Sequence, residues 1–254
     1  MIFCRFRYRD DSTKTPRYGI VESHQIKEIS PNPFQEFEIA EEEIPFSSTL
    51  LLAPVLPSKI IGVGLNYNAH VKEMGVKDPE EPVLFLKPST SLIGPEDSIH
   101  YPKTSERVDY EGELAVVIKK RGKDIALENV NEYILGYSCF NDITARDLQK
   151  KDGQWSRAKS FDTFSALGPW IISDLDPSNL QIESYLNGEL KQNGKTSDMI
   201  FNVPHLVSFI SKVMTLEPGD VIATGTPPGI GPMQKGDSVD IRIEGIGILR
   251  NTVQ

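Results

Sequence analysis

Two glutamates at the start of a long apolar run constrain this chain more than any other feature. Glu111 and Glu113 stand two residues apart, and the run Leu114–Ile118 that follows is typical of a buried strand. Residues two apart on a strand project from the same face, so both carboxylates would enter one small volume. Ionised carboxylates there repel each other and lose hydration, unless one takes up a proton or a cation lies between them. A divalent metal is the simplest solution.

Asp142 offers a third carboxylate. It follows the next apolar segment, Tyr133 to Phe140, which can pair beside the first strand. Ligation by oxygen alone favours a hard ion, Mg²⁺, Mn²⁺ or Ca²⁺, over Zn²⁺. A bare Glu-x-Glu pair is also typical of the solvated face of an edge strand, and the pair by itself leaves both interpretations open.

The composition excludes several classes of partner. The chain has 254 residues, with 27 Lys and Arg against 36 Asp and Glu and a net charge of −9, so nucleic acid and anionic membrane are not expected partners. Its only cysteines, Cys4 and Cys139, argue against a disulfide framework and for a reducing compartment. Arg5 and Arg7 lie where a signal peptide needs apolar residues, and no apolar run has the length of a membrane span. These features predict a cytoplasmic protein.

A boundary is expected near residues 53–58, where two prolines interrupt regular structure. Residues 1–55 form a small β-rich module by their pattern, with no group of side chains that suggests chemistry. Its expected role is packing or an interface. Residues 56–254 carry all the candidate site residues.

His70 and Glu73 are candidates for acid–base chemistry. They lie in a predicted short helix that Asn66 or Asn68 opens and Gly75 ends. Residues three apart on a helix are neighbours, so the Glu73 carboxylate can orient an imidazole that acts as a general base. A solvated surface pair explains the same spacing, and the spacing does not separate the two.

Two further segments carry candidate polar groups. Arg146 and Gln149 are three apart on a predicted helix that Thr144 caps, and they can bind a substrate carboxylate. Lys159 lies in a segment without helical or strand periodicity, where a lysine can be catalytic. Solvent-exposed side chains remain the alternative for all three.

Three later segments predict structure without predicting chemistry. Residues 204–214 have the apolar spacing of a helix, and Asn187-Gly188 predicts a hairpin turn. The loop Thr224–Pro232 lacks the Gly-Lys-Ser/Thr ending of a phosphate-binding loop, and its prolines remove amide donors. Nucleotide binding is therefore excluded, although the glycines of the loop allow close approach of the backbone to a ligand.

Several motifs in sequence order resemble those of the fumarylacetoacetate hydrolase family, from about Ile60 to Val253. These motifs are Gly64-Leu65-Asn66-Tyr67-Asn68-Ala69-His70, Phe85-Leu86-Lys87-Pro88, Asp109-Tyr110-Glu111-Gly112-Glu113-Leu114, Asn141-Asp142-Ile143-Thr144-Ala145-Arg146-Asp147, Ala158-Lys159-Ser160-Phe161-Asp162 and Thr224-Gly225-Thr226-Pro227. The resemblance implies a β-rich α+β fold, a mixed β-sandwich roll with the small N-terminal β module before it, and usually a homodimer.

The resemblance also implies roles for individual residues. It implies Mg²⁺ or Mn²⁺ held by Glu111, Glu113 and Asp142. The other residues it implies are the catalytic residues His70 and Glu73, as an acid–base dyad on a lid, and Lys159, together with Arg146, Gln149 and Thr226 around the substrate.

The most similar part of the family includes acylpyruvate hydrolases, oxaloacetate decarboxylases and hydroxyheptadienedioate isomerases. The expected activity is metal-dependent hydrolysis of a C–C bond in a 2,4-dioxo acid, an acylpyruvate-type substrate, through a pyruvate enolate on the metal. Oxaloacetate decarboxylation and isomerisation of 2-hydroxyhepta-2,4-diene-1,7-dioate are alternatives that use the same metal site. A non-catalytic dicarboxylate-binding protein is a more remote one.

Overall fold

A large mixed β-sheet forms the centre of the protein. The structure is a computed structural model that describes residues 1–10, 13 and 15–254. Its strands are β1 (Ile2–Tyr8), β2 (Arg17–Glu22), β3 (Gln25–Ser30), β4 (Glu38–Pro45), β5 (Thr49–Leu52), β6 (Ile60–Gly64), β7 (Val83–Lys87), β8 (Leu92–Ile93), β11 (Gly112–Ile118), β12 (Ile134–Asp142), β14 (Ser165–Ile172) and β17 (Val221–Ala223). The order across the sheet is β4-β3-β2-β1-β14-β12-β11-β17-β6-β7, with β5 beside β1 and β8 beside β14.

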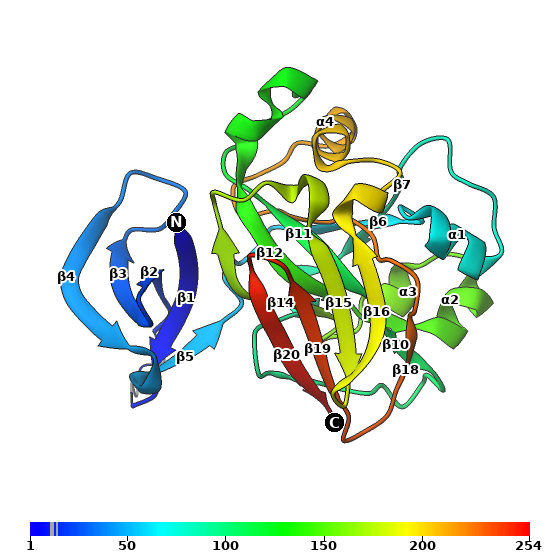
Figure 1. Cartoon of the computed structure of the whole chain (residues 1–254), viewed down its shortest axis with the longest axis horizontal. Helices are drawn as coiled ribbons and strands as arrows, with labels where there is room; N and C mark the ends of the chain where they lie inside the picture. Colours follow the sequence, from blue (N-terminus) through cyan, green and yellow to red (C-terminus); the bar gives the residue numbers. More distant parts are fainter. Residues whose placement is uncertain (11–12, 14) are drawn as a thin grey trace.

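Two smaller sheets complete the β structure of the described residues. One has the order β16-β15-β19-β20-β9 and the other β13-β10-β18. Their bounds are β9 (Ser98–Ile99), β15 (Gln181–Leu186), β16 (Glu189–Lys195), β19 (Ser238–Ile243), β20 (Gly247–Val253), β10 (Val108–Tyr110), β13 (Thr144–Ala145) and β18 (Gly231–Met233). The strands β19 and β20 pass across β11, β12 and β14, which makes the sandwich (Figure 1). The predicted β-rich α+β fold is confirmed.

Short helices lie mainly at one end of the molecule. They are α1 (Asn68–Met74), α2 (Arg146–Asp152), α3 (Ser156–Lys159) and α4 (Val203–Val213), with 3₁₀ turns at η1 (Phe46–Ser48), η2 (Ser89–Ser91), η3 (Leu127–Tyr133), η4 (Pro177–Asn179) and η5 (Thr196–Asp198). Figure 1 shows α1, α2 and α3 together on the side away from the N-terminal strands. Among the described residues, no helix has the length and apolar character needed to cross a membrane.

Strand β11 is buried on both faces, which explains its unbroken apolar run. Leu114, Val116 and Ile118 pack into the core under the five-stranded sheet, whereas Ala115 and Val117 pack into a second core on the opposite face. A strand between two apolar layers has no solvent face and so shows no alternation of polar residues.

The segment expected to be one strand around Glu111 is divided in two. β10 belongs to the small sheet and β11 to the large one, and Glu111 lies at the bend between them. Glycine at residue 112 leaves room for the buried Ser184 side chain, because a Cβ there would lie 2.3 Å from Ser184 Oγ. The apolar pattern predicted the buried strand β11 correctly and missed the separate strand β10 and the change of sheet.

The N-terminal strands continue the central sheet. β1 pairs with β14 through Ile2 opposite Ile172 and Phe3 opposite Ile171. Figure 1 shows this unit beside the rest of the chain, joined to it along one strand edge. The division of the chain into residues 1–55 and 56–254 stays a prediction.

Asp220 holds the start of β6 against β17, and its loss is predicted to destabilise the fold. Its buried carboxylate accepts hydrogen bonds from Ser58 Oγ at 2.6 Å, Lys59 N at 3.2 Å and Glu217 N at 2.8 Å, and pairs with Lys59 Nζ. Asp220→Ala leaves these donors without their acceptor and should lower the free energy of unfolding by about 2–4 kcal/mol. Urea denaturation measures the loss; Asp78→Ala, at an exposed loop position, is the control. Equal midpoints for the two variants would contradict the prediction.

Candidate active site

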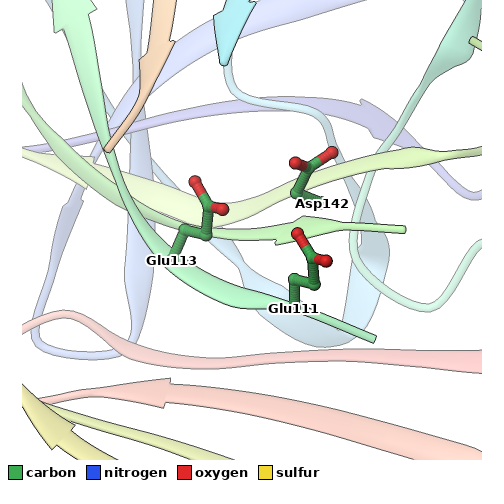
Figure 2. A group of neighbouring side chains, drawn as sticks. All are labelled: Glu111, Glu113 and Asp142. Atoms are coloured by element: carbon green, nitrogen blue, oxygen red, sulfur yellow. The ribbon is translucent and has the colours of Figure 1, made fainter. Parts of the chain in front are cut away.

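Three buried carboxylates meet at the junction of the two sheets. One oxygen each from Glu111, Glu113 and Asp142 lies within 4.8 Å of the others, and Figure 2 shows the three groups converging. Glu111 comes from the bend before β11, Glu113 from β11, and Asp142 from the end of β12. Antiparallel pairing sets Gly112 opposite Asn141, which brings the end of β12 to the glutamates. The structure therefore brings together the three residues predicted to bind metal.

Two buried lysines neutralise part of this charge. Lys159 Nζ donates to Glu111 Oε2 at 2.8 Å and to Asp142 Oδ2 at 2.6 Å. Lys87 Nζ pairs with Asp142 Oδ1 and donates to Phe164 O at 2.6 Å. Lys159 lies at the end of the short helix α3, so the expectation of an irregular segment was wrong.

Lys87 is a site residue that the sequence analysis missed. The signal for it is a lysine at the end of an apolar strand directly before proline, where a solvated position would be unusual. Its side chain is fully buried, and burial lowers the pKa of its ammonium, although the Asp142 carboxylate opposes this. A buried ammonium keeps its charge only where acceptors surround it. For Lys87 these acceptors are the charged Asp142 carboxylate and the Phe164 carbonyl.

The carboxylates differ in their electrostatic surroundings. Burial opposes ionisation of Glu111, but Lys159 and Arg146 lower its pKa below the usual value. Burial, with repulsion from Asp142 and Glu111, raises the pKa of Glu113 well above the usual value. The hydrogen bond from Gly225 N to Glu113 Oε2, at 2.8 Å, is its one described donor. Glu113 therefore favours a proton or a cation, and the three-oxygen donor set suits a hard divalent ion.

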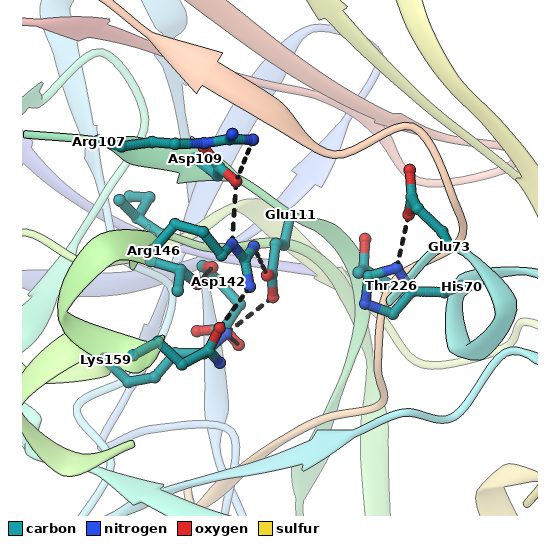
Figure 3. A network of polar contacts seen from close by, with 12 residues as sticks. His70, Glu73, Arg107, Asp109, Glu111, Asp142, Arg146, Lys159 and Thr226 are labelled. Atoms are coloured by element: carbon teal, nitrogen blue, oxygen red, sulfur yellow. Dashed lines mark hydrogen bonds and ion pairs between the residues drawn. The ribbon is translucent and has the colours of Figure 1, made fainter. Parts of the chain in front are cut away.

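The Arg146 guanidinium binds neighbouring side chains of the site, so it is not free to bind a substrate with all its nitrogens. Its Nε donates to Asp109 Oδ2 at 2.9 Å, one terminal nitrogen pairs with Glu111 Oε1, and the other donates to Gln149 Oε1 at 2.7 Å (Figure 3). The Thr144 hydroxyl donates to Asp142 O at 2.9 Å and does not cap α2, so that predicted cap was wrong. The remaining amide nitrogen of Gln149 has no described protein partner and is available to a ligand.

Thr226 lines the same cavity, but its hydroxyl is already engaged. It donates to Gly112 O at 2.9 Å and accepts from Gln192 Nε2 at 2.8 Å. The buried Gln192 also accepts from Gly112 N at 2.9 Å, so it fixes the backbone between the two glutamates. No sequence pattern indicated Gln192.

His70 and Glu73 form the expected pair on α1. His70 Nδ1 lies 2.8 Å from Glu73 Oε2, and Glu73 Oε1 accepts from Gly229 N at 3.0 Å. Gly75 ends the helix in the left-handed conformation, as predicted, but no side chain caps its start. Asn66 instead donates to Thr224 O at 2.7 Å. Figure 3 shows His70 and the lysine–arginine cluster on opposite sides of Glu111.

The groups enclose one small cavity of about 30 Å³, room for about one water molecule. His70, the three carboxylates, Gln149, Lys159 and Thr226 line it together with an apolar wall. That wall includes Met74, Phe85 and Trp155, the last two in edge contact with ring centroids 5.4 Å apart. His70 and the three carboxylates thus face one small volume with a polar and an apolar side.

Two known protein families match this chain. The family described as fumarylacetoacetate (FAA) hydrolase C-terminal matches residues 59–254, and a family described as Rv2993c-like, N-terminal, matches residues 1–54. The structure of a 5-carboxymethyl-2-hydroxymuconate delta-isomerase from Mycobacterium smegmatis superposes with a TM-score of 0.93 at 45% identity, covering 100% of this chain and 99% of that one.

Two further relatives carry other activities in their names. The mitochondrial oxaloacetate tautomerase Fahd2a of Rattus norvegicus is 44% identical over 222 residues, 83% of this chain and 71% of its own. A maleylpyruvate hydrolase from Sphingobium sp. SYK-6 has a TM-score of 0.82 at 30% identity, covering 100% of this chain and 99% of that one. The resemblance in the motifs is confirmed: this chain belongs to the fumarylacetoacetate hydrolase family, whose members are enzymes.

Proposed function

We propose that the protein is a divalent-metal-dependent enzyme that moves a proton at the carbon beside the keto group of a short 2-oxo acid, in an isomerase or tautomerase reaction. The observation that carries this proposal is the position of His70. Its Nδ1 is held by Glu73, while the imidazole lines the same cavity as the three carboxylates. The isomerase and tautomerase relatives, at 45% and 44% identity, support this choice of reaction.

Glu111, Glu113 and Asp142 would hold the metal, Mg²⁺ or Mn²⁺. Such an ion would offset the repulsion and burial that raise the pKa of Glu113, and it prefers ligands that are all oxygen atoms. When bound, the ion supplies a Lewis acid that polarises the keto oxygen of the substrate. Lys87 and Arg146 keep the supporting carboxylates in place through their ion pairs with Asp142 and Glu111.

The remaining residues divide the proton chemistry between them. With Nδ1 directed to Glu73, His70 has Nε2 to take the proton from the substrate carbon and to return it at a different position. Glu73 orients the imidazole and stabilises its protonated form. Lys159 and the free amide nitrogen of Gln149 supply donors to the oxygen on which enolate charge develops.

C–C hydrolysis of a 2,4-dioxo acid, the activity expected from the sequence, is the second candidate. The same dyad can deprotonate a water that attacks the distal carbonyl, and the maleylpyruvate hydrolase supports it at 30% identity. Oxaloacetate decarboxylation needs the electron sink without the water. The homodimer and the cytoplasmic location remain predictions.

One experiment separates these reactions. Acetylpyruvate, the enol form of oxaloacetate, oxaloacetate itself and a hydroxymuconate-type diacid are each incubated with the enzyme and Mg²⁺ or Mn²⁺, and the products are identified. Tautomerised or isomerised product without loss of carbon supports the proposal. Pyruvate with a carboxylic acid from acetylpyruvate supports hydrolysis, and turnover of none of the substrates would reject enolate chemistry at this site.

The raised pKa of Glu113 predicts a stability difference that reverses with metal. Because folding raises this pKa above its value of 4.5 in model compounds, stability without metal falls as pH rises from there toward the folded pKa. Glu113→Gln carries no charge to bury, so at pH 7.5 in EDTA it should melt a few degrees above the wild type.

Saturating Mn²⁺ should reverse the order, because only the wild type keeps the full ligand set and gains the binding free energy. Differential scanning calorimetry measures both melting temperatures, with Glu41→Gln, on an exposed strand, as the control. Equal stabilisation of Glu113→Gln and wild type by Mn²⁺ would place the metal elsewhere.

His70→Gln tests the base. Proton transfer, or water activation, should fall by roughly 10²–10⁴-fold, the usual contribution of general acid–base catalysis. Decarboxylation of oxaloacetate, which needs no base, should fall much less. Both rates are measured on metal-saturated enzyme, with the exposed His100→Gln as the control. Equal losses in both reactions would assign His70 a binding role instead.

A further inference from the structure

A single loop contacts both halves of the site. Residues 224–230 connect β17 to β18, and two of their glycine amides donate to carboxylates. Gly225 N donates to Glu113 Oε2 at 2.8 Å, and Gly229 N donates to Glu73 Oε1 at 3.0 Å. The loop therefore links the carboxylate that favours a cation to the carboxylate that orients His70.

Both backbone groups of Gly229 are bound. Its N–H donates to Glu73, and its carbonyl accepts from the Tyr110 hydroxyl at 3.0 Å. Tyr110 is buried at the end of β10, directly before Glu111, and pairs with Gly231 of β18. A buried hydroxyl on a paired strand is a fixed donor, so it sets the position of the Gly229 carbonyl.

Residue 229 must be glycine for this arrangement. Its φ of +100° is strained for other residues, and a Cβ would lie 2.3 Å from Lys191 O. The loop is thus confined from one side by β16 and held from the other by Tyr110.

Helix α1 needs such an anchor. It has seven residues and no side-chain cap, and only His70 and Val71 of it are buried. A helix this short is not stable by itself in water and depends on tertiary contacts. The Glu73 side chain is 33% exposed, so hydrogen bonds, more than burial, determine where its carboxylate points.

We propose that Tyr110 and Gly229 are positioning residues, which hold Glu73 and, through it, His70 in place on α1. The two hydrogen bonds, from the Tyr110 hydroxyl to Gly229 O and from Gly229 N to Glu73, are called the clasp. The proposal rests on the proposed role of the His70–Glu73 pair in proton transfer. Strand β10, which leads into Glu111, then also supports Glu73 and His70 through Tyr110 and Gly229. The three carboxylates and the His70–Glu73 pair therefore keep a fixed relative position.

Tyr110→Phe tests the clasp by removing one hydroxyl. Hydrogen–deuterium exchange of the α1 amides should accelerate by roughly 2–10-fold, the usual effect of losing one hydrogen bond on local opening. The kcat for the 2-oxo acid substrate should fall by a similar factor with little change in KM. Tyr185→Phe is the matched control, because that hydroxyl donates to Glu183 and not to the loop. Both of its readouts should stay at the wild-type level.

Gly229→Ala gives a second route to the same effect, because the added Cβ displaces the loop without touching Tyr110. Faster exchange confined to α1 and the 224–230 loop in both variants supports the clasp. Unchanged α1 exchange in folded Tyr110→Phe, or faster exchange spread evenly over the chain, would overturn it. Exchange needs no turnover, so it decides the clasp even if the wild type converts no 2-oxo acid, a result that would reject the proposed function alone.

Discussion

The repulsion among three buried carboxylates is the constraint on which the site depends. Glu111, Glu113 and Asp142 converge away from solvent, where like charges are costly. Lys87 and Lys159 offset part of this cost at Asp142 and Glu111, and Arg146 engages the remaining oxygen of Glu111. From the described residues, Glu113 receives a single hydrogen bond, from the Gly225 amide. Glu113 therefore lacks the cationic partner that Glu111 and Asp142 have among the described residues. A divalent ion between the three carboxylates would supply that positive charge.

The supporting residues explain why so few groups remain for a substrate. The Arg146 guanidinium is engaged by Asp109, Glu111 and Gln149, and the Thr226 hydroxyl is engaged by backbone and Gln192. These contacts hold the three carboxylates in place, and they leave Arg146 and Thr226 with fewer groups that can bind a substrate directly. Among the described residues that line the cavity, His70 Nε2 and the Gln149 amide nitrogen have no protein partner, and Lys159 keeps one N–H beyond its contacts with Glu111 and Asp142. This set suits moving protons and stabilising negative charge on one small molecule.

The site joins two kinds of structure with different mechanical character. Glu113 and Asp142 belong to strands packed on both faces, and Glu111 directly precedes one of them, whereas His70 and Glu73 belong to a short helix with little buried surface. Catalysis by proton transfer demands that these parts keep a separation fixed to within a fraction of an ångström. The loop of residues 224–230 contacts both, through Gly225 and Gly229, and so connects them directly.

The sequence alone predicted that the two glutamates share one face, that His70 and Glu73 are neighbours on a short helix, and which family the chain resembles, because strand and helix periodicity and motif order are local properties. Glu111 and Glu113 were placed correctly by their spacing, and Asp142 by the strand next to theirs. Tertiary structure decided the rest. The change of sheet at Glu111, the burial of Lys87 beside Asp142, the engagement of Arg146 and the Tyr110–Gly229 contact all join segments distant in the chain. Local pattern specifies which way a side chain points, but which donor meets which acceptor depends on how the sheets cross and pack.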